Sequence, residues 1–196
     1  MSGTADPATM LADVQQLRER VRADRRTVTA PLLVFGLLIL AHAVAVSLAT
    51  ATAGGPRHSV NFLYWPLAGA VGLGVLWWQA RRIATRDGVG EGRRSYRPVT
   101  LGYVVSVPLL ALMFLPVFFF GVFAPLVWPA GVLYAIARRQ HSQALRRASI
   151  ALAVAAVPQV LLVMAALGPA WLGVDVAAGL ALIVVALVLR ARAAAA

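Results

Sequence analysis

The stretch that decides the fold reads PLLVFGLLILAHAVAVSLAT (31–50), ATAGGPRHS (51–59) and VNFLYWPLAGAVGLGVLWWQ (60–79). The first and third segments are each 20 residues long and carry no Asp, Glu, Lys or Arg. At about 1.5 Å per residue, a helix of that length spans about 30 Å, the thickness of the hydrocarbon core of a bilayer. The polar, glycine-rich segment between them favours a turn. We therefore predict a hairpin of two transmembrane helices here.

Composition supports a membrane protein throughout the chain. Of 196 residues, 61% are hydrophobic and 13% are charged, and the mean hydropathy is +0.80. A typical soluble domain is about half apolar and about a quarter charged, so this excess needs lipid as its solvent. No room remains for a second, soluble domain. The absence of cysteine excludes disulfides, thiolate metal sites and covalent haem attachment.

The positions of the basic residues predict the topology. All eighteen are arginine, and all except Arg57 fall in four clusters, at 18–26, 81–97, 138–147 and 190–192. An arginine at the bilayer centre costs about 3 kcal/mol or more, and short arginine-rich loops stay in the cytoplasm. We therefore expect all four clusters on the cytoplasmic side. Each apolar stretch between two clusters must then cross the membrane an even number of times.

The apolar stretch 99–137 is too long for one span and long enough for two, with a turn at Gly121 and Pro125. A kinked re-entrant pair is the alternative for this stretch. The last apolar stretch also predicts two spans, 149–167 and 174–189. They are separated by a break at Gly168, Pro169 and Gly173.

The predicted fold is thus all-α. Residues 31–196 are expected to form a polytopic bundle of six transmembrane helices in three hairpins, in the plasma membrane, with both termini cytoplasmic. The aromatic residues agree with these depths. Those expected near the outer surface are Tyr64, Trp65 and Trp171, and those expected near the inner surface are Trp77, Trp78, Tyr96 and Tyr134. Two competing interpretations, a cleaved signal peptide ending near residue 51 and a threefold internal repeat, fit the lengths and spacings less well.

Residues 1–30 predict a cytoplasmic amphipathic arm. Asp6 and Pro7 are typical of a helix start. An apolar stripe then recurs at helical spacing, at Met10, Val14, Leu17 and Val21. We expect this helix to lie on lipid headgroups at the inner leaflet. The alternatives are docking on another membrane protein or on a second copy of the chain, while nucleic-acid binding has no motif behind it.

Two polar residues interrupt the spans at similar depth. His42 is the eleventh residue of the first span and Gln159 the eleventh of the fifth, so both are expected near the midplane. A hydrogen bond between them would need only helix packing to explain it. A proton-responsive or ligand-binding His42 is the alternative.

A second polar group is expected near the outer surface, where Asn61, Tyr64 and Asp175 share a depth. These residues would either line an extracellular mouth or serve as headgroup contacts and loop caps. The candidate ligand-binding residues are therefore His42, Gln159, Asn61, Tyr64 and Asp175. The sequence shows no pair of buried carboxylates, histidine box, phosphate-binding glycine loop or glycine-flanked nucleophilic serine. We accordingly predict no catalytic residue, metal or cofactor.

Three short motifs resemble a group of small polytopic membrane proteins of actinobacteria. They are FLYWPL (62–67), the pattern at Leu11, Asp13, Val14, Leu17, Val21 and Arg22, and Pro129-Ala130-Gly131 leading to Arg138. That group has no characterised activity and is often encoded beside winged-helix transcriptional regulators. The resemblance implies a link to gene regulation or stress response, with no substrate or catalytic residue to carry over.

Three functions follow in order of preference. The first is a non-enzymatic sensing or accessory module that packs with itself or another membrane protein. The second is a small-molecule transporter or exporter with a cavity near His42 and Gln159. The third is a lipid-processing membrane enzyme.

Overall fold

In the computed structural model, residues 7–53, 58–86, 96–113, 124–164 and 170–195 are described, and their regular structure is all α-helix. The predicted all-α class is confirmed. The helices are α1 (Pro7–Ala53), α2 (His58–Arg86), α3 (Arg97–Met113), α5 (Val127–Gln140), α6 (Gln143–Met164) and α7 (Ala170–Ala195).

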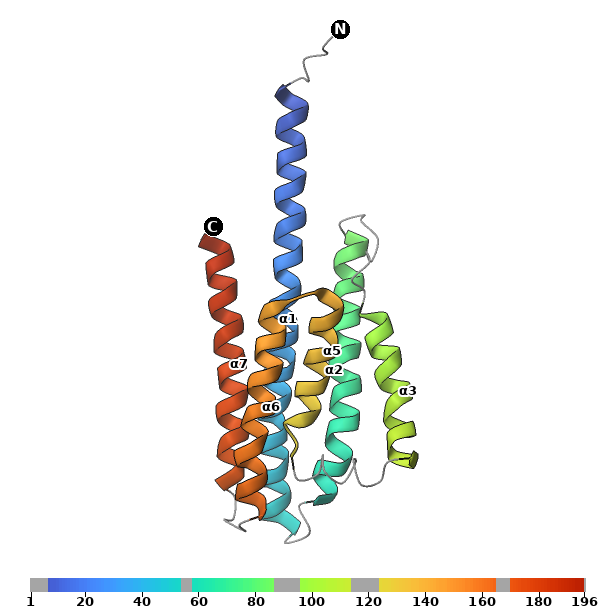
Figure 1. Cartoon of the computed structure of the whole chain (residues 1–196), viewed down its shortest axis with the longest axis vertical. Coiled ribbons are helices and arrows are strands. Elements are labelled where there is room, and N and C mark those ends of the chain that lie inside the picture. Colours follow the sequence, from blue (N-terminus) through green and yellow to red (C-terminus); the bar gives the residue numbers. More distant parts are fainter. Residues whose placement is uncertain (1–6, 54–57, 87–95, 114–123, 165–169, 196) are drawn as a thin grey trace.

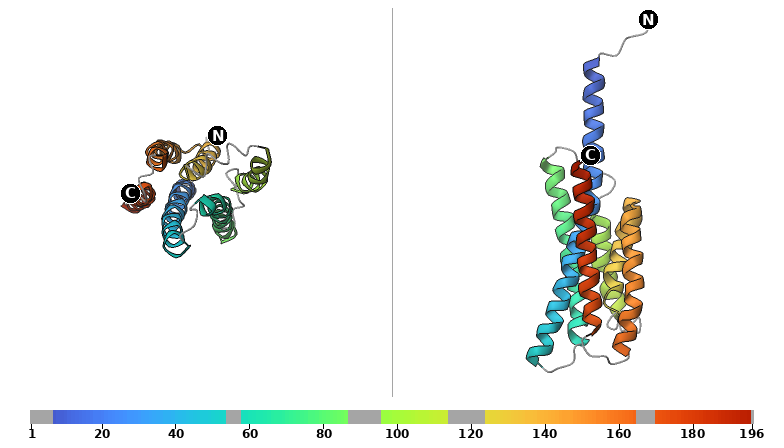
Figure 2. Two further views of the ribbon diagram at one scale, coloured as in Figure 1. Left: turned by 90° about the horizontal axis from the view of Figure 1, so that it is seen from below. Right: turned by 90° about the vertical axis from the view of Figure 1, so that its left-hand side faces the viewer.

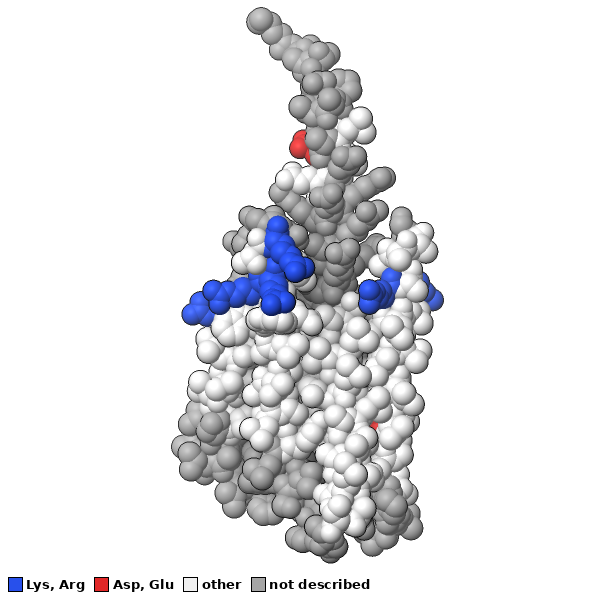
Figure 3. Space-filling model, turned by 180° about the vertical axis from the view of Figure 1, so that it is seen from behind, with Lys and Arg blue, Asp and Glu red and all other residues white. Residues whose placement is uncertain are grey.

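Successive helices of the bundle run in opposite directions (Figure 1). This alternation brings the described arginines to one end, where several of them are visible on the face shown in Figure 3. We call this the arginine end. It carries Arg81, Arg82 and Arg86 of α2, Arg97 of α3, Arg138 and Arg139 of α5, Arg146 and Arg147 of α6, and Arg190 and Arg192 of α7.

In the described part of the chain, three helices are long and apolar enough to cross a membrane. These segments are Val28–Thr52, Gln143–Val163 and Ala170–Ala195. They are fewer than the six spans predicted. α5 has 14 residues, about 21 Å, which falls short of a hydrocarbon core of about 30 Å. α3 is described over 17 residues, as far as Met113. At 29 residues α2 is also long enough to cross a hydrocarbon core, although its first six side chains lie outside the described residues.

The two predicted breaks fare differently. Pro125 and Leu126 form a turn just before α5, as expected, while Gly121 lies outside the described residues. Gly173 lies inside α7 rather than in a break, because α7 already begins at Ala170. A glycine within a helix costs only about 1 kcal/mol, which the packing of a long helix offsets. Gly168 and Pro169 lie outside the described residues.

The longest helix joins the arm to the first span. α1 runs for 47 residues with Pro31 inside it, a length of about 70 Å. Its first residue is Pro7, as predicted, and Asp6 lies outside the described residues. The arm continues in line with the span and projects beyond the bundle at the arginine end (Figure 1). It is therefore continuous with the transmembrane part.

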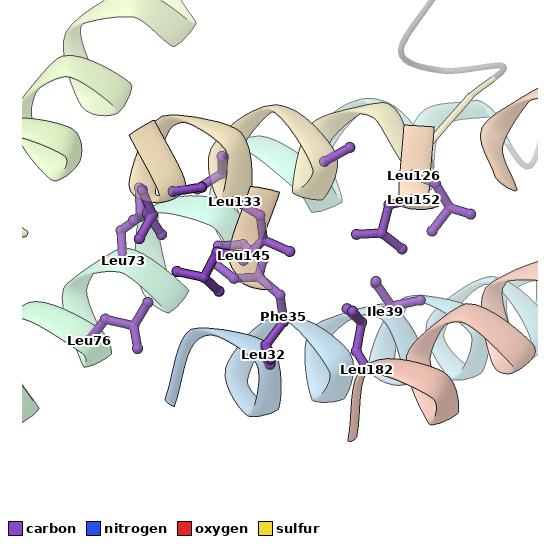
Figure 4. Packing of buried hydrophobic residues seen from close by; sticks show 14 of the residues in the cluster. Leu32, Phe35, Ile39, Leu73, Leu76, Leu126, Leu133, Leu145, Leu152 and Leu182 are labelled. Carbon is purple, nitrogen blue, oxygen red and sulfur yellow. The ribbon is translucent and has the colours of Figure 1, made fainter. Parts of the chain in front are cut away.

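Apolar stripes at helical spacing build the core. On α1, Leu32, Phe35, Ile39 and Val46 are all buried. Their separations of three, four and seven residues place them on one face of the helix. Figure 4 shows this face packed against leucines of α2, α5, α6 and α7.

The first and last helices pack most closely. α1 lies between α7 and α2 when the bundle is seen along its axis (Figure 2). A Cβ atom added to Gly36 would lie 3.0 Å from the carbonyl oxygen of Gly179, and a Cβ on Gly179 would lie 3.0 Å from the carbonyl oxygen of Gly36. Glycine at both positions therefore allows the two backbones to approach.

Candidate functional site

Three helices each place one fully buried polar residue in a stripe that is mainly apolar. His42 follows Phe35 and Ile39 on the buried face of α1. Gln159 continues the stripe of Leu152 and Ala156 on α6, and Asp175 lies between Trp171 and Gly179 on α7. Because these faces meet in the bundle, the three polar side chains come together.

These side chains form a hydrogen-bonded group that we call the polar network. His42 Nδ1 lies 3.0 Å from Asp175 Oδ2, and Gln159 Nε2 donates to Asp175 Oδ1 at 2.7 Å. The side chains of His42, Gln159 and Asp175 are fully buried, each with a relative exposure of 0%. Both carboxylate oxygens of Asp175 therefore have a partner inside the protein.

The backbone of the turn before α5 completes the network and orients Gln159. The N–H of Leu126 donates to Gln159 Oε1 at 3.3 Å. Leu126 is the N-cap of α5, and Gln159 supplies the acceptor for its N–H group from another helix. Since the amide oxygen accepts this bond, the amide nitrogen faces Asp175 and can only donate to it.

Aromatic rings surround His42. The ring centroid of Tyr64 lies 5.0 Å from that of the imidazole, that of Trp65 at 5.3 Å and that of Trp171 at 6.3 Å. Trp65 and Trp171 are buried at 1% and 5% exposure. These two tryptophans, expected at the outer surface of the membrane, thus face the interior of the bundle. The π-face of an aromatic ring attracts a cation, so this setting accommodates an imidazolium.

Two tyrosine hydroxyl groups donate hydrogen bonds to backbone carbonyl groups of neighbouring helices. Tyr64 Oη donates to the carbonyl oxygen of Leu38 on α1 at 2.7 Å, and Tyr103 Oη of α3 donates to that of Trp65 at 2.8 Å. The indole N–H of Trp65 is buried and has no hydrogen-bond partner within the described part of the chain. A buried donor without an acceptor costs about 1–3 kcal/mol.

The structure brings together four of the five predicted site residues. His42 and Gln159 lie at one site, joined through Asp175 rather than by a direct bond. Asp175 is fully buried, so it neither lines a mouth nor contacts headgroups as expected. Tyr64 packs on His42, and the side chain of Asn61 lies outside the described residues.

The network lies nearer the end opposite the arginines than the midplane. Gln159 is five residues from the last residue of α6, and Asp175 is five residues from the first residue of α7. Five residues of helix correspond to about 7.5 Å. α6 begins at Gln143, before the predicted start of that span at residue 149, so Gln159 lies in the second half of the described helix. Its depth in the membrane stays a prediction.

The arginine end carries a separate set of aromatic residues. The guanidinium of Arg82 lies 3.8 Å above the ring of Trp78, whose side chain is 52% exposed. Tyr96 is buried beside Gln140, and its burial raises its pKa above the ordinary value, partly offset by a hydrogen bond with Gln140. These contacts are typical of residues at a membrane–water interface.

Neither a metal centre nor a relative identifies the site. In the part of the chain that the structure describes, no group of three or more His, Asp or Glu residues is arranged to hold a metal ion. No protein family matches the chain, and no curated protein or solved structure is significantly similar to it. The resemblance to the actinobacterial group therefore stays a prediction.

Proposed function

We propose that this protein is an integral, multi-pass protein of the plasma membrane with six transmembrane helices and both termini in the cytoplasm. We further propose that it acts as a non-enzymatic sensing or accessory module. The three long apolar helices and the collection of arginines at one end support the membrane topology.

The observation that carries the proposed function is the closed character of the polar network. His42, Gln159 and Asp175 are fully buried and bond to one another and to the backbone. A transport site must exchange its internal contacts for contacts with a substrate, and a catalytic site must present a reactive group to one. A network that joins α1, α5, α6 and α7 instead suits a device that holds these helices in a defined arrangement.

The order of the helices supports six crossings. Each described helix runs opposite to the one before it, and α3 and α5 follow the same alternation (Figure 1). α5 begins at the depth of Gln159, where its first turn bonds to that side chain. The second hairpin therefore has a shorter second limb than the other two, a difference that a reporter can test.

The exposed apolar stripe on the arm indicates which partners the protein would bind. Met10, Leu11, Val14 and Leu17 are exposed on the part of α1 that projects from the bundle. Membrane lipids, a second copy or another membrane protein would cover this stripe.

Thiol labelling tests the closed network, because the chain contains no cysteine. Gln159→Cys would be treated in intact and permeabilised cells with a membrane-impermeant maleimide. We expect no labelling on either side. Ser142→Cys, in the connection between α5 and α6 at the arginine end, is the matched control and should react only after permeabilisation. Labelling at position 159 would overturn the proposed function and favour transport.

Reporter fusions test the topology independently. An alkaline phosphatase fused after Arg139 should be inactive, because this enzyme folds only outside the cytoplasm, and a fusion after Gly168 should be active. An active fusion after Arg139 would overturn the six-span arrangement. That result would also show that the second predicted hairpin does not consist of two full membrane crossings.

One observation favours the second candidate, a small-molecule transporter. The indole N–H of Trp65 is buried beside His42 without a partner in the described residues. A substrate with an acceptor oxygen would satisfy it. If the protein is a transporter, a cysteine at position 159 would react with the maleimide, and a transported substrate would slow this reaction.

A further inference from the structure

We propose that His42 and Asp175 together form a proton-binding site, and that the proton bound there controls the packing of α7 on α1. This inference deepens the proposed function and rests on it, since it names the proton as the ligand of a sensing module.

The network fixes the proton that His42 and Asp175 share, and the imidazole ring can bind a second, exchangeable proton. Gln159 presents its N–H group to Asp175 Oδ1, and its own oxygen is occupied by the N–H of Leu126. Oδ1 is thereby fixed as an acceptor. A proton shared by the pair must lie between Asp175 Oδ2 and His42 Nδ1, which are 3.0 Å apart.

Among the described residues, few ionisable groups face this position. Asp175 comes from α7, and the phenol of Tyr64 comes from α2, with its hydroxyl donating to the backbone of α1. α6 contributes the neutral Gln159, and the turn before α5 contributes the backbone N–H of Leu126. The described arginines lie at the other end of the bundle: Arg190 is 15 residues from Asp175 along α7, about 22 Å.

Charge balance links the proton to packing. With the proton bound, imidazolium and carboxylate neutralise one another, or both groups are uncharged. Loss of the proton leaves one net negative charge in a fully buried site. A buried charge without a counter-charge is strongly unfavourable, so release of the proton favours any arrangement that admits water between α1 and α7.

The close contact between α1 and α7 lies near the His42–Asp175 pair, so a change at the pair would affect it. Gly36 on α1 and Gly179 on α7 hold the backbones in close contact within two turns of the pair. Both helices continue from the pair to the arginine end, α1 into the projecting arm and α7 to Arg190 and Arg192. A change of packing at the pair would therefore reach the opposite end of the bundle. The proton would enter from the end of the bundle opposite the arginines, because the polar network lies nearer to that end along α6 and α7.

Histidine NMR on the full chain in mild detergent tests the proton site. His58 and His141 would be replaced by glutamine, so that His42 remains as the sole histidine. The ¹⁵N signals of its ring would be followed from about pH 5 to about pH 9, a range that brackets ordinary histidine titration. We expect the ring to bind one proton reversibly and to bind it less readily in Asp175→Asn, because the carboxylate that balances the charge of the imidazolium is then lost.

A second measurement reports packing. Spin labels at Val44 of α1 and Val176 of α7, both exposed on the bundle surface, would give the distance between the helices at each pH. We expect the distance distribution to be narrow at low pH and to widen as the proton leaves, with no pH dependence in His42→Leu. If Asp175→Asn fails to fold, the titration and the distances in the otherwise unchanged chain still decide the matter.

The proposal is overturned if the ring of His42 keeps one protonation state over the whole range, or if it titrates while the helix distance stays constant. Neither result bears on thiol protection at position 159 or on the reporter fusions. Failure of the proton site is therefore distinguishable from failure of the proposed function.

Discussion

Two interfaces of the bundle are built in different ways. Where α1 meets α7, a pair of glycines brings the backbones together and a buried His–Asp pair bonds across the contact. Where α2 meets α3, Tyr103 packs against Gly69 and a single hydroxyl bonds to the carbonyl oxygen of Trp65. The first interface combines close packing with buried polar bonds, and the hydrogen bond described at the second comes from one aromatic side chain.

The difference reflects how far apart the partners are along the chain. His42 and Asp175 are separated by 133 residues, whereas Tyr103 and Trp65 are separated by 38. In lipid, apolar side chains gain little by leaving the solvent, so helix pairing depends on small residues and polar bonds. A long chain segment also costs more entropy to close than a short one. The interface between distant helices therefore needs the more specific contacts.

The largest effect is expected from Asp175→Ala. It removes the acceptor of His42 Nδ1 and of Gln159 Nε2 at once, leaving buried polar groups unpaired. We expect the free energy of unfolding to fall by about 3 kcal/mol, the usual cost of breaking a buried pair. Denaturant titration in mild detergent measures this.

Two further variants show whether unpaired groups cause that loss. Asp13→Ala changes an exposed carboxylate on the arm and should leave stability unchanged. Combined replacement of His42 and Asp175 by leucine removes both charged partners together, and should recover much of the stability lost in Asp175→Ala. Equal losses in the single and combined variants would show that the volume of the side chains, rather than their bonding, matters.

The second effect tests the glycine contact. Gly179→Val would bring a Cβ atom within 3.0 Å of the carbonyl oxygen of Gly36 and 2.9 Å of Leu40 Cγ, so the helices must separate. Overpacking of this kind costs about 1–3 kcal/mol, and the midpoint of thermal unfolding should fall accordingly. Gly102→Val on α3 is the control, because a Cβ there meets nothing within 4 Å. Comparable losses at both glycines would argue against a specific close contact between α1 and α7.

The position of a residue along a helix could be predicted better than the side of the helix on which its side chain lies. The all-α class, the turn at Pro125 and the helix start at Pro7 follow from apolar length and local backbone preferences, and the structure has them. Asp175 was expected at the surface, yet it occupies the buried stripe of Trp171, Gly179 and Leu182. The spacing of four, four and three residues in that stripe is visible in the sequence and predicts that Asp175 faces the interior of the bundle.

Which helices become neighbours was harder to predict. Hairpins follow from short connections, but the pairing of α1 with α7 depends on two glycines and two polar residues on helices at opposite ends of the chain. No local pattern specifies that contact. The inward position of Trp65 was missed for a related reason: tryptophan near a span end is typical of lipid headgroup contact, and only the neighbouring helices show that the ring faces His42.

The smallest effect is expected from Tyr103→Phe at the second interface. The hydroxyl of Tyr103 donates to the carbonyl oxygen of Trp65 at 2.8 Å, and that oxygen lies within α2, where the helix itself supplies a donor. Loss of the hydroxyl therefore leaves no buried group without a partner, in contrast to Asp175→Ala. Interhelical hydrogen bonds in membranes contribute about 0.6 kcal/mol on average, and we expect a loss of about that size in denaturant titration. Tyr134→Phe, on an exposed side chain of α5, should change nothing. A loss at Tyr103 as large as that at Asp175 would mean that the two interfaces depend equally on polar bonds, and that chain separation does not determine how specific a helix contact must be.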